Sequence, residues 1–110
     1  MLGMLGLCAR AGRLITGEKA CIQAVRSGAA RVVLLDGAAS DNAVGALSRA
    51  CATHAVPLLR TEPDELGRAI GRPSRMAAAV TDGAMARQII ALSIADGRAP
   101  VDPEPPVGTE

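Results

Sequence analysis

An uninterrupted apolar run near the middle of the chain restricts the fold more than any other feature. Residues 31–35 read Arg-Val-Val-Leu-Leu, so four apolar side chains follow one another and two of them are β-branched. A strand with one face in water alternates apolar and polar residues, whereas a continuous apolar run is typical of a strand covered on both faces. We therefore expect a strand over 31–35 that lies between two layers of helices.

Helical and extended patterns alternate along the rest of the chain. Apolar residues at helical spacing predict helices, and short apolar segments bounded by glycine, proline and polar residues predict strands. The expected helices cover 1–11, 18–27, 40–53, 61–71 and 82–95, and the expected strands cover 14–15, 31–35, 56–60 and 76–81. This order indicates an α/β fold, namely a three-layer α/β/α sandwich with a small mixed sheet of about four strands.

Polar residues mark where several of these helices begin. Ser40 and Asp82 stand at the N-cap positions of the third and fifth expected helices. Thr61 and Asp64 have the spacing of a capping box, and Pro63 fits the first turn of the fourth helix. The residues expected to face inward are Cys21, Ile22 and Val25 in the second helix, Val44, Leu47 and Cys51 in the third, and Met85, Ile89 and Leu92 in the fifth.

The chain has the length of one domain followed by a short tail. Its 110 residues are in the size range of a single compact domain, which we place at residues 1–95. Residues 96–110 contain four prolines among acidic and small residues, so this segment is expected to be a disordered, Pro-rich acidic tail. Before Asp96 the chain has 11 basic and 7 acidic residues, a surplus that permits an RNA partner.

The composition excludes several kinds of site. No Phe, Tyr or Trp is present, so bases cannot stack on aromatic rings and any contact with a nucleic acid must be polar. Cys8, Cys21 and Cys51 are widely spaced among apolar residues, which predicts buried thiols in a reducing compartment, the cytoplasm. The single histidine, His54, fits the end of a helix. We expect no metal site, no cofactor and no membrane span, since the apolar start over 1–8 is too short to cross a bilayer.

The sequence also lacks the patterns of an enzyme. Asp36, Ser40 and His54 can be written as a triad, but no nucleophile elbow or oxyanion-hole pattern accompanies them. Neither of the Gly-rich patterns that bind nucleotides occurs. We therefore expect no catalytic residues and no small-molecule substrate, and interpret the protein as non-enzymatic.

Two glycine-containing stretches each combine a helix end, a tight backbone path and positive charge. The first extends from Thr16 to Gly28, and the second extends from Leu66 to Arg75. On the helix expected over 18–27, Lys19, Gln23 and Arg26 recur at helical spacing on one exposed face. Helix N-termini and clustered arginines suit phosphate oxygens. The predicted RNA-binding residues are Gly17, Glu18, Lys19, Gln23, Arg26, Gly67, Arg68, Gly71, Arg72 and Arg75.

Taken in order, four motifs resemble a known family. They are LGLCARAGR at 5–13, TGE at 16–18, VRSGAARVVLL at 25–35 and LGRAIG at 66–71. Their order and spacing are similar to those of the L7Ae/L30e ribosomal-protein-like RNA-binding domains, within which the chain looks like the small bacterial branch. The resemblance extends over residues 1 to about 95, nearly the whole part of the chain expected to be ordered.

The resemblance implies an L30e-like sandwich that binds structured RNA in the cytoplasm as a ribonucleoprotein component, with a role in translation. Ribosomal RNA, the ribosome and kink-turn RNA are the implied partners, and the protein is expected to be a monomer. The family grips RNA with the helix that here begins at Gly17 and with the loop that here follows Gly71. Kink-turn binders carry Asn, Glu and Lys on that helix, where this chain has Lys19, Ala20 and Gln23, so a relaxed or different RNA target is expected.

Two other functions remain open at this point. The chain could be a protein-interaction module associated with the ribosome or the transcription machinery. It could also be an accessory domain that recruits substrate in trans for an RNA-modifying enzyme.

Overall fold

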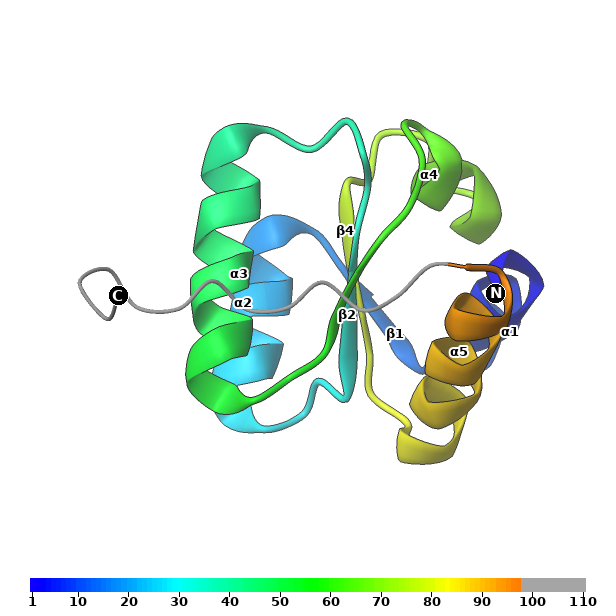
Figure 1. Ribbon diagram of the computed structural model, residues 1–110, viewed down its shortest axis with the longest axis horizontal. Helices are drawn as coiled ribbons and strands as arrows, with labels where there is room; N and C mark the ends of the chain where they lie inside the picture. The colour runs from blue at the N-terminus through cyan, green and yellow to red at the C-terminus, as the bar shows by residue number, and fades with distance from the viewer. Residues whose placement is uncertain (98–110) are drawn as a thin grey trace.

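Helices cover both faces of a single sheet in the computed structural model, which describes residues 1–97 (Figure 1). The helices are α1 (Leu2–Arg10), α2 (Glu18–Ser27), α3 (Asp41–His54), α4 (Glu65–Ile70) and α5 (Gly83–Ala95). The strands are β1 (Leu14–Thr16), β2 (Val32–Leu35), β3 (Leu58–Arg60) and β4 (Ala77–Val80). The expected α/β/α sandwich is confirmed. The predicted tail lies outside the described residues except for its first two positions, so the boundary at 95 stays a prediction.

The sheet is mixed, and its strand order is β1-β4-β2-β3. β2 and β3 are parallel, whereas β4 runs antiparallel to both of its neighbours, β1 and β2. The last strand in the chain therefore lies inside the sheet. Its residue Ala79 is paired with Ile15 on one side and Val33 on the other.

β4 consists of three alanines and one valine, a composition with low strand propensity. All four residues are nevertheless buried, and alternate side chains enter different cores. Ala77 and Ala79 join the core beneath α2 and α3, while Ala78 and Val80 join the core beneath α1, α4 and α5. Pairing on both edges and burial on both faces outweigh the weak propensity. The predicted strand over 76–81 is thus confirmed.

Most helix signals predicted from the sequence are confirmed. The Ser40 hydroxyl accepts a hydrogen bond from the backbone N–H of Ala43, and the Asp82 carboxylate accepts one from the N–H of Met85. Gly71 adopts the left-handed conformation that ends α4. The structure thus places N-caps and a glycine helix end where local sequence rules predict them.

The predicted start of α4 is wrong. The helix begins at Glu65, so Pro63 precedes it and does not occupy its first turn. The hydrogen bond from a backbone N–H to a carboxylate three residues later, which a capping box requires, is made by Glu62 and Glu65. The N–H of Glu62 donates to the carboxylate of Glu65 at 3.0 Å. Thr61 does not cap the helix because its hydroxyl donates to the buried carboxylate of Asp36.

The predicted inward stripe of α5 is wrong at one position. Leu92 is 39% exposed, whereas its neighbour Ser93 is fully buried with Ala86 and Ile89. Small side chains on this face allow a helix to lie close to the sheet, so burial here does not follow the size of the apolar side chain.

In α2 and α3 the predicted inward residues differ in how far they are buried. Cys21, Val25, Leu47 and Cys51 are buried as predicted, and Ile22 and Val44 are partly buried.

The three cysteines are buried and form no disulfide, as predicted. Burial raises the pKa of Cys21 to about 12, with a smaller contribution from the nearby Cys51. Burial also raises the pKa of Cys51, to about 11. Both side chains are therefore neutral thiols at neutral pH.

Gly67 lets α4 contact the loop that follows it. A Cβ atom at this position would lie 2.6 Å from the carbonyl oxygen of Arg72 and 2.7 Å from that of Pro73. Both neighbours are backbone atoms, which cannot swing aside as a flexible side chain can. The absence of a side chain at Gly67 therefore allows the backbone of Arg72 and Pro73 to lie close against α4.

We expect the substitution Gly67→Ala to destabilise the protein by about 1–3 kcal/mol, because the added methyl group must displace the backbone of the following loop. Gly3→Ala is the matched control, since Gly3 lies in α1 with nothing within 4 Å of an added Cβ. Alanine has the higher helix propensity, so the control should be neutral or slightly stabilising. Chemical denaturation of both variants measures the difference, and equal midpoints would contradict the packing account.

Candidate nucleic-acid interface

The two stretches predicted to bind RNA lie side by side because of how β1 and β4 pair. The strands are antiparallel and Thr16 pairs with Ala78, so the end of β1 lies next to the start of β4. α2 follows β1 directly, and the arginine-containing loop precedes β4 directly. The N–H of Gly17 donates to the carbonyl oxygen of Ala77 at 3.0 Å and joins the two segments.

The guanidinium group of Arg75 lies against the start of α2. Gly17 has a φ of 99° and, as the N-cap residue, supplies no side-chain capping bond. A Cβ atom on Gly17 would lie 3.3 Å from Nη1 of Arg75, so the arginine occupies the space that a side chain would take. The first N–H groups of a helix have no partner within the helix and carry partial positive charge. This arrangement gathers hydrogen-bond donors and a full positive charge at one place.

A hollow of about 440 Å³ opens at this place. Its walls come from the start of α2 (Gly17 and Glu18), the segment from Ala38 to Ala43, and the segment from Ser74 to Ala77. The segment between β2 and α3 was not among the predicted binding residues. It reaches the site because β2, like β1, ends where β4 begins, and Leu35 pairs with Ala77. The loops gather at the upper end of the sheet in Figure 1.

The predicted site residues separate into those near the hollow and those away from it. Gly17, Glu18 and Arg75 line it, and Lys19 follows on the exposed side of α2. Arg72 lies in the same loop as Arg75 and lines a smaller hollow beside Thr16. We group five residues as the α2–loop surface: Gly17, Glu18 and Arg75, which line the hollow, Lys19, which follows Glu18, and Arg72, which lies in the same loop as Arg75.

Three other predicted residues, all in or next to α4, have different surroundings. Gly67 is buried and serves the close packing described above. Arg68 is exposed, and its Nε atom donates to the carbonyl oxygen of Asp64. Gly71 is exposed and ends the helix. These positions shape the arginine loop, and nothing in their geometry aims them at the hollow.

Gln23 and Arg26 extend the exposed face of α2 away from the hollow. Both are exposed, together with Lys19, as the helical spacing predicted. Arg26 lies nine residues beyond Gly17, which corresponds to roughly 14 Å along a helix axis. Arg26 is therefore near the opposite end of α2 from the α2–loop surface.

The positive charges of the α2–loop surface are not neutralised within residues 1–97. Lys19, Arg72 and Arg75 form no ion pair with any residue of that range. The carboxylate of Glu18 is the acidic group in the hollow, and it too is unpaired within the described residues. A surface with three unpaired cations around a helix N-terminus favours an anionic partner.

The buried carboxylate of Asp36 holds the loops behind this surface. Its Oδ2 atom accepts hydrogen bonds from the N–H groups of Ala38 at 2.9 Å and Asp64 at 2.8 Å. Its Oδ1 atom accepts from the N–H of Leu66 at 3.0 Å and from the hydroxyl of Thr61 at 3.1 Å. One side chain thus joins the β2–α3 loop to the β3–α4 connection.

These hydrogen bonds keep Asp36 ionised. Burial alone would raise its pKa, but the N–H groups of Ala38, Leu66 and Asp64, with the Thr61 hydroxyl, outweigh burial and lower the pKa below its ordinary value. The sequence analysis missed this role of Asp36, because its partners Thr61, Asp64 and Leu66 are 25 to 30 residues away along the chain. The one signal that the sequence offered was an acidic residue directly after a buried strand.

The Arg60 side chain supports the same junction. Its Nη2 atom donates to the carbonyl oxygens of Asp36 and Gly37, at 3.4 Å each. Gly37 is required there, since a Cβ atom would lie 2.8 Å from the carbonyl oxygen of Thr61. The two connections are therefore in close contact through backbone atoms as well as through Asp36.

No cluster of residues that could hold a metal ion occurs within residues 1–97, and none of the helices in that range combines the length and apolar character of a membrane span. Asp36, Ser40 and His54 also do not form a triad. Asp36 is enclosed by its four hydrogen bonds, and Ser40 and His54 stand at opposite ends of α3.

We expect Asp36→Asn to lower the free energy of unfolding by about 2–4 kcal/mol near neutral pH, because an amide cannot accept from all the donors that face it. The lowered pKa means that this stabilisation is complete above the ordinary aspartate value of 3.8 and is lost as the pH falls through the lower pKa of the folded protein. The gap in stability between wild type and Asp36→Asn should therefore narrow in acid.

Denaturation of both proteins between neutral pH and pH of about 2 measures that gap. Asp41→Asn is the control, because Asp41 is an exposed residue in the first turn of α3. A gap that is the same at every pH, or an equal loss in the Asp41 variant, would show that the Asp36 charge does not stabilise the junction.

Comparison with known proteins places this geometry in a family. Residues 1–90 match the ribosomal protein L7Ae/L30e/S12e/Gadd45 family. The chain is 37% identical over 90 residues to the RNA-binding protein YlxQ of Bacillus subtilis (strain 168), covering 81% of this chain and 90% of that protein. It is 30% identical over 83 residues to the RNA-binding protein YlxQ of Enterococcus faecium, covering 74% of this chain and 81% of that protein.

Solved structures share the fold. A protein of unknown function from Bacillus halodurans C superposes with a TM-score of 0.79 at 35% identity, covering 83% of this chain and 93% of that one. The Giardia lamblia 15.5kD RNA binding protein superposes with a TM-score of 0.69 at 21% identity, covering 86% of this chain and 84% of that one. With the family match over 1–90 and the similarity to both YlxQ proteins, the chain belongs to the ribosomal protein L7Ae/L30e/S12e/Gadd45 family.

Proposed function

We propose that the protein binds structured RNA through the α2–loop surface and catalyses no reaction. The observation that carries this proposal is the position of the Arg75 guanidinium beside Gly17 at the start of α2, 3.3 Å from where a Cβ atom of residue 17 would lie. Helix N–H groups and an arginine at one place can hold a phosphate oxygen from two sides. The names of the two YlxQ relatives, both RNA-binding proteins, support the same function.

The binding mode follows from the residues that the chain lacks. Without Phe, Tyr or Trp, unpaired bases have no aromatic ring on which to stack. Recognition therefore depends on the shape of the RNA and on its phosphate backbone. A folded RNA presents phosphates from more than one strand at a bend, and the hollow between Gly17, Ser40 and Ser74 can receive such a bend.

The finer part of the proposal concerns the RNA and the setting. We propose a bent RNA of the kink-turn type, in ribosomal RNA or on the ribosome, bound by a monomer in the cytoplasm during translation. Lys19 and Ala20 supply no carboxylate to accept hydrogen bonds from base edges. Preference for a kink-turn over a straight duplex should accordingly be modest and should arise from backbone contacts.

Binding is tested by fluorescence titration of the purified chain with a kink-turn oligonucleotide and a straight duplex of equal length, at several salt concentrations. We expect affinity to fall as salt rises. The double variant Arg72→Ala/Arg75→Ala should reduce the slope of log affinity against log salt by about 1.4–1.8, since each lost phosphate contact removes about 0.7–0.9.

Arg10→Ala/Arg87→Ala is the charge-matched control, because both arginines are exposed on α1 and α5, across the sheet from α2. The control should change the slope far less than the loop variant. Wild-type protein that binds neither RNA in a salt-sensitive way would refute the proposal, and equal slopes for the two double variants would refute the assignment of the surface.

A further inference from the structure

A second cationic surface lies at the far end of α2, away from Gly17. Two neighbouring hollows, of about 370 and 270 Å³, lie where the C-terminal ends of α2 and α3 meet, and both are lined by Arg26 and His54. Arg31 lines the first and Arg49 lines the second. Within the described residues 1–97, neither hollow has an aspartate or glutamate in its lining. We call these four residues, Arg26, Arg31, Arg49 and His54, the C-end surface.

Favourable interaction with helix dipoles explains the position of only some of these side chains. Arg26 is in the last turn of α2, where a cation interacts favourably with the carbonyl end of the helix, and the His54 imidazole is in the last turn of α3. Arg31 precedes β2 in a loop, and Arg49 lies before the last turn of α3. Both are exposed and form no ion pair with any residue of the described range 1–97. Cations gathered without an acidic neighbour repel one another until an anion binds.

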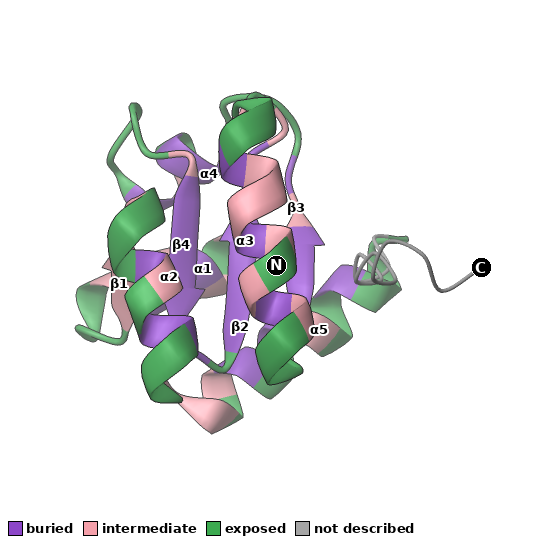
Figure 2. Cartoon of the chain, turned by 90° about the vertical axis from the view of Figure 1, so that its left-hand side faces the viewer, coloured by how far each residue is buried: buried purple, intermediate pink, exposed green. Residues whose placement is uncertain are grey.

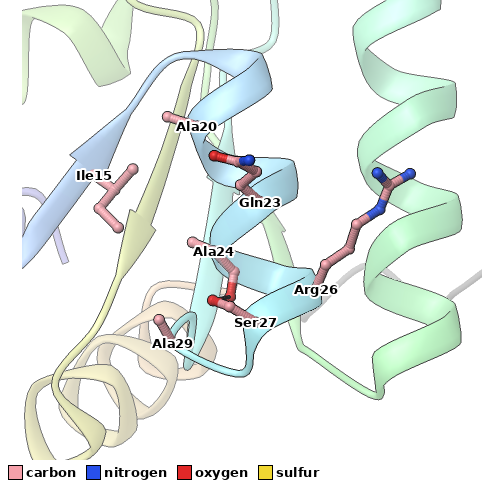
Figure 3. Close-up of a pocket in the computed structure, with 7 residues that line it drawn as sticks. All are labelled: Ile15, Ala20, Gln23, Ala24, Arg26, Ser27 and Ala29. Atoms are coloured by element: carbon pink, nitrogen blue, oxygen red, sulfur yellow. Dashed lines mark hydrogen bonds between the residues drawn. The ribbon is translucent and has the colours of Figure 1, made fainter.

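The C-end surface is continuous with the α2–loop surface. Lys19, Gln23 and Arg26 follow one exposed face along α2, and α2 and α3 lie side by side in front of the sheet in Figure 2. Figure 3 shows that the Arg26 side chain extends from α2 toward α3, away from Ile15. A polar track therefore connects the start of α2 with the C-end surface over roughly 14 Å.

The surface fits a phosphate backbone better than a protein. The centre of a protein interface is built around large apolar or aromatic anchors. The large apolar side chains that are exposed within residues 1–97 are Leu7, Leu92 and Ile94, which belong to α1 and α5 across the sheet. The C-end surface thus offers charge without an apolar anchor.

We propose that the C-end surface is a second RNA-backbone site, which holds the arm of the RNA that continues from the α2–loop surface along α2. The inference rests on the proposed function, because the two sites bind successive parts of one RNA. It adds a prediction that the α2–loop surface alone does not make. Affinity and salt dependence must increase when the RNA is long enough to reach Arg26 and Arg49.

The test compares two RNAs that share one bend. In the short RNA both stems end near the bend, and in the long RNA the stems are extended by about one helical turn. For wild-type protein, the slope of log affinity against log salt should be steeper with the long RNA by about 2.1–2.7, as three additional phosphate contacts require. The triple variant Arg26→Ala/Arg31→Ala/Arg49→Ala should bind the short RNA as wild type does. With the long RNA it should show no increase in affinity or in salt dependence, and we call this increase the gain.

The matched control is Arg10→Ala/Arg13→Ala/Arg87→Ala, which removes the same charge from three exposed residues outside the α2 and α3 layer and should keep the gain. A single reversal, Arg49→Glu, should also reduce the gain without touching α2. Thermal unfolding of each variant verifies that the exposed substitutions leave the fold intact.

The outcomes separate the two proposals. Binding of the short RNA that depends on Arg72 and Arg75, with no gain from the long RNA, would overturn the C-end site and leave the proposed function in place. In that case the surface would be free for an acidic protein partner. No binding of either RNA would overturn both proposals, and a gain that survives in the triple variant would overturn the residue assignment.

Discussion

The antiparallel pairing of β1 with β4 is the constraint on which the site depends. Because the strands run in opposite directions, the segment that leaves β1 must lie beside the segment that enters β4. The first of these is the start of α2, and the second is the arginine loop. The hydrogen bond from Gly17 to Ala77 fixes their separation, and the missing side chain at Gly17 leaves room for Arg75. The proposed RNA surface is therefore a consequence of sheet topology combined with one glycine.

Asp36 links the stability of the fold to the geometry of this surface. β2 ends at the same edge of the sheet, so the residue after it lies behind the hollow that Gly17 and Ser74 line. Its carboxylate accepts hydrogen bonds from backbone N–H groups on two connections, and it supplies a partner for the buried N–H of Leu66. Asp64 has a φ of 65°, a left-handed conformation that its hydrogen bond to Asp36 helps to hold. An ionised group beneath the surface thus keeps the neighbouring loops in place.

Local patterns in the sequence predicted the elements and several caps, because helical spacing, N-caps and glycine helix ends are short-range features. Ser40, Asp82 and Gly71 illustrate this success. Strand order was beyond such patterns, since pairing of β4 between β1 and β2 joins residues far apart in the chain. The start of α4 and the role of Asp36 were missed for the same reason, because Thr61 bonds to a residue 25 positions away. The exposure of Leu92 and burial of Ser93 depend on which side of α5 faces the sheet.

The central claim is that the start of α2 and the arginine loop contact RNA together. Backbone amide signals of the isotope-labelled chain, followed by NMR while a kink-turn RNA is added, test this most directly. The account predicts that the signals of residues 17–20, 38–40 and 72–76 shift together and saturate at one RNA concentration, while those of α5 stay in place. Shifts confined to α1 and α5, or shifts of α2 without the arginine loop, would contradict it.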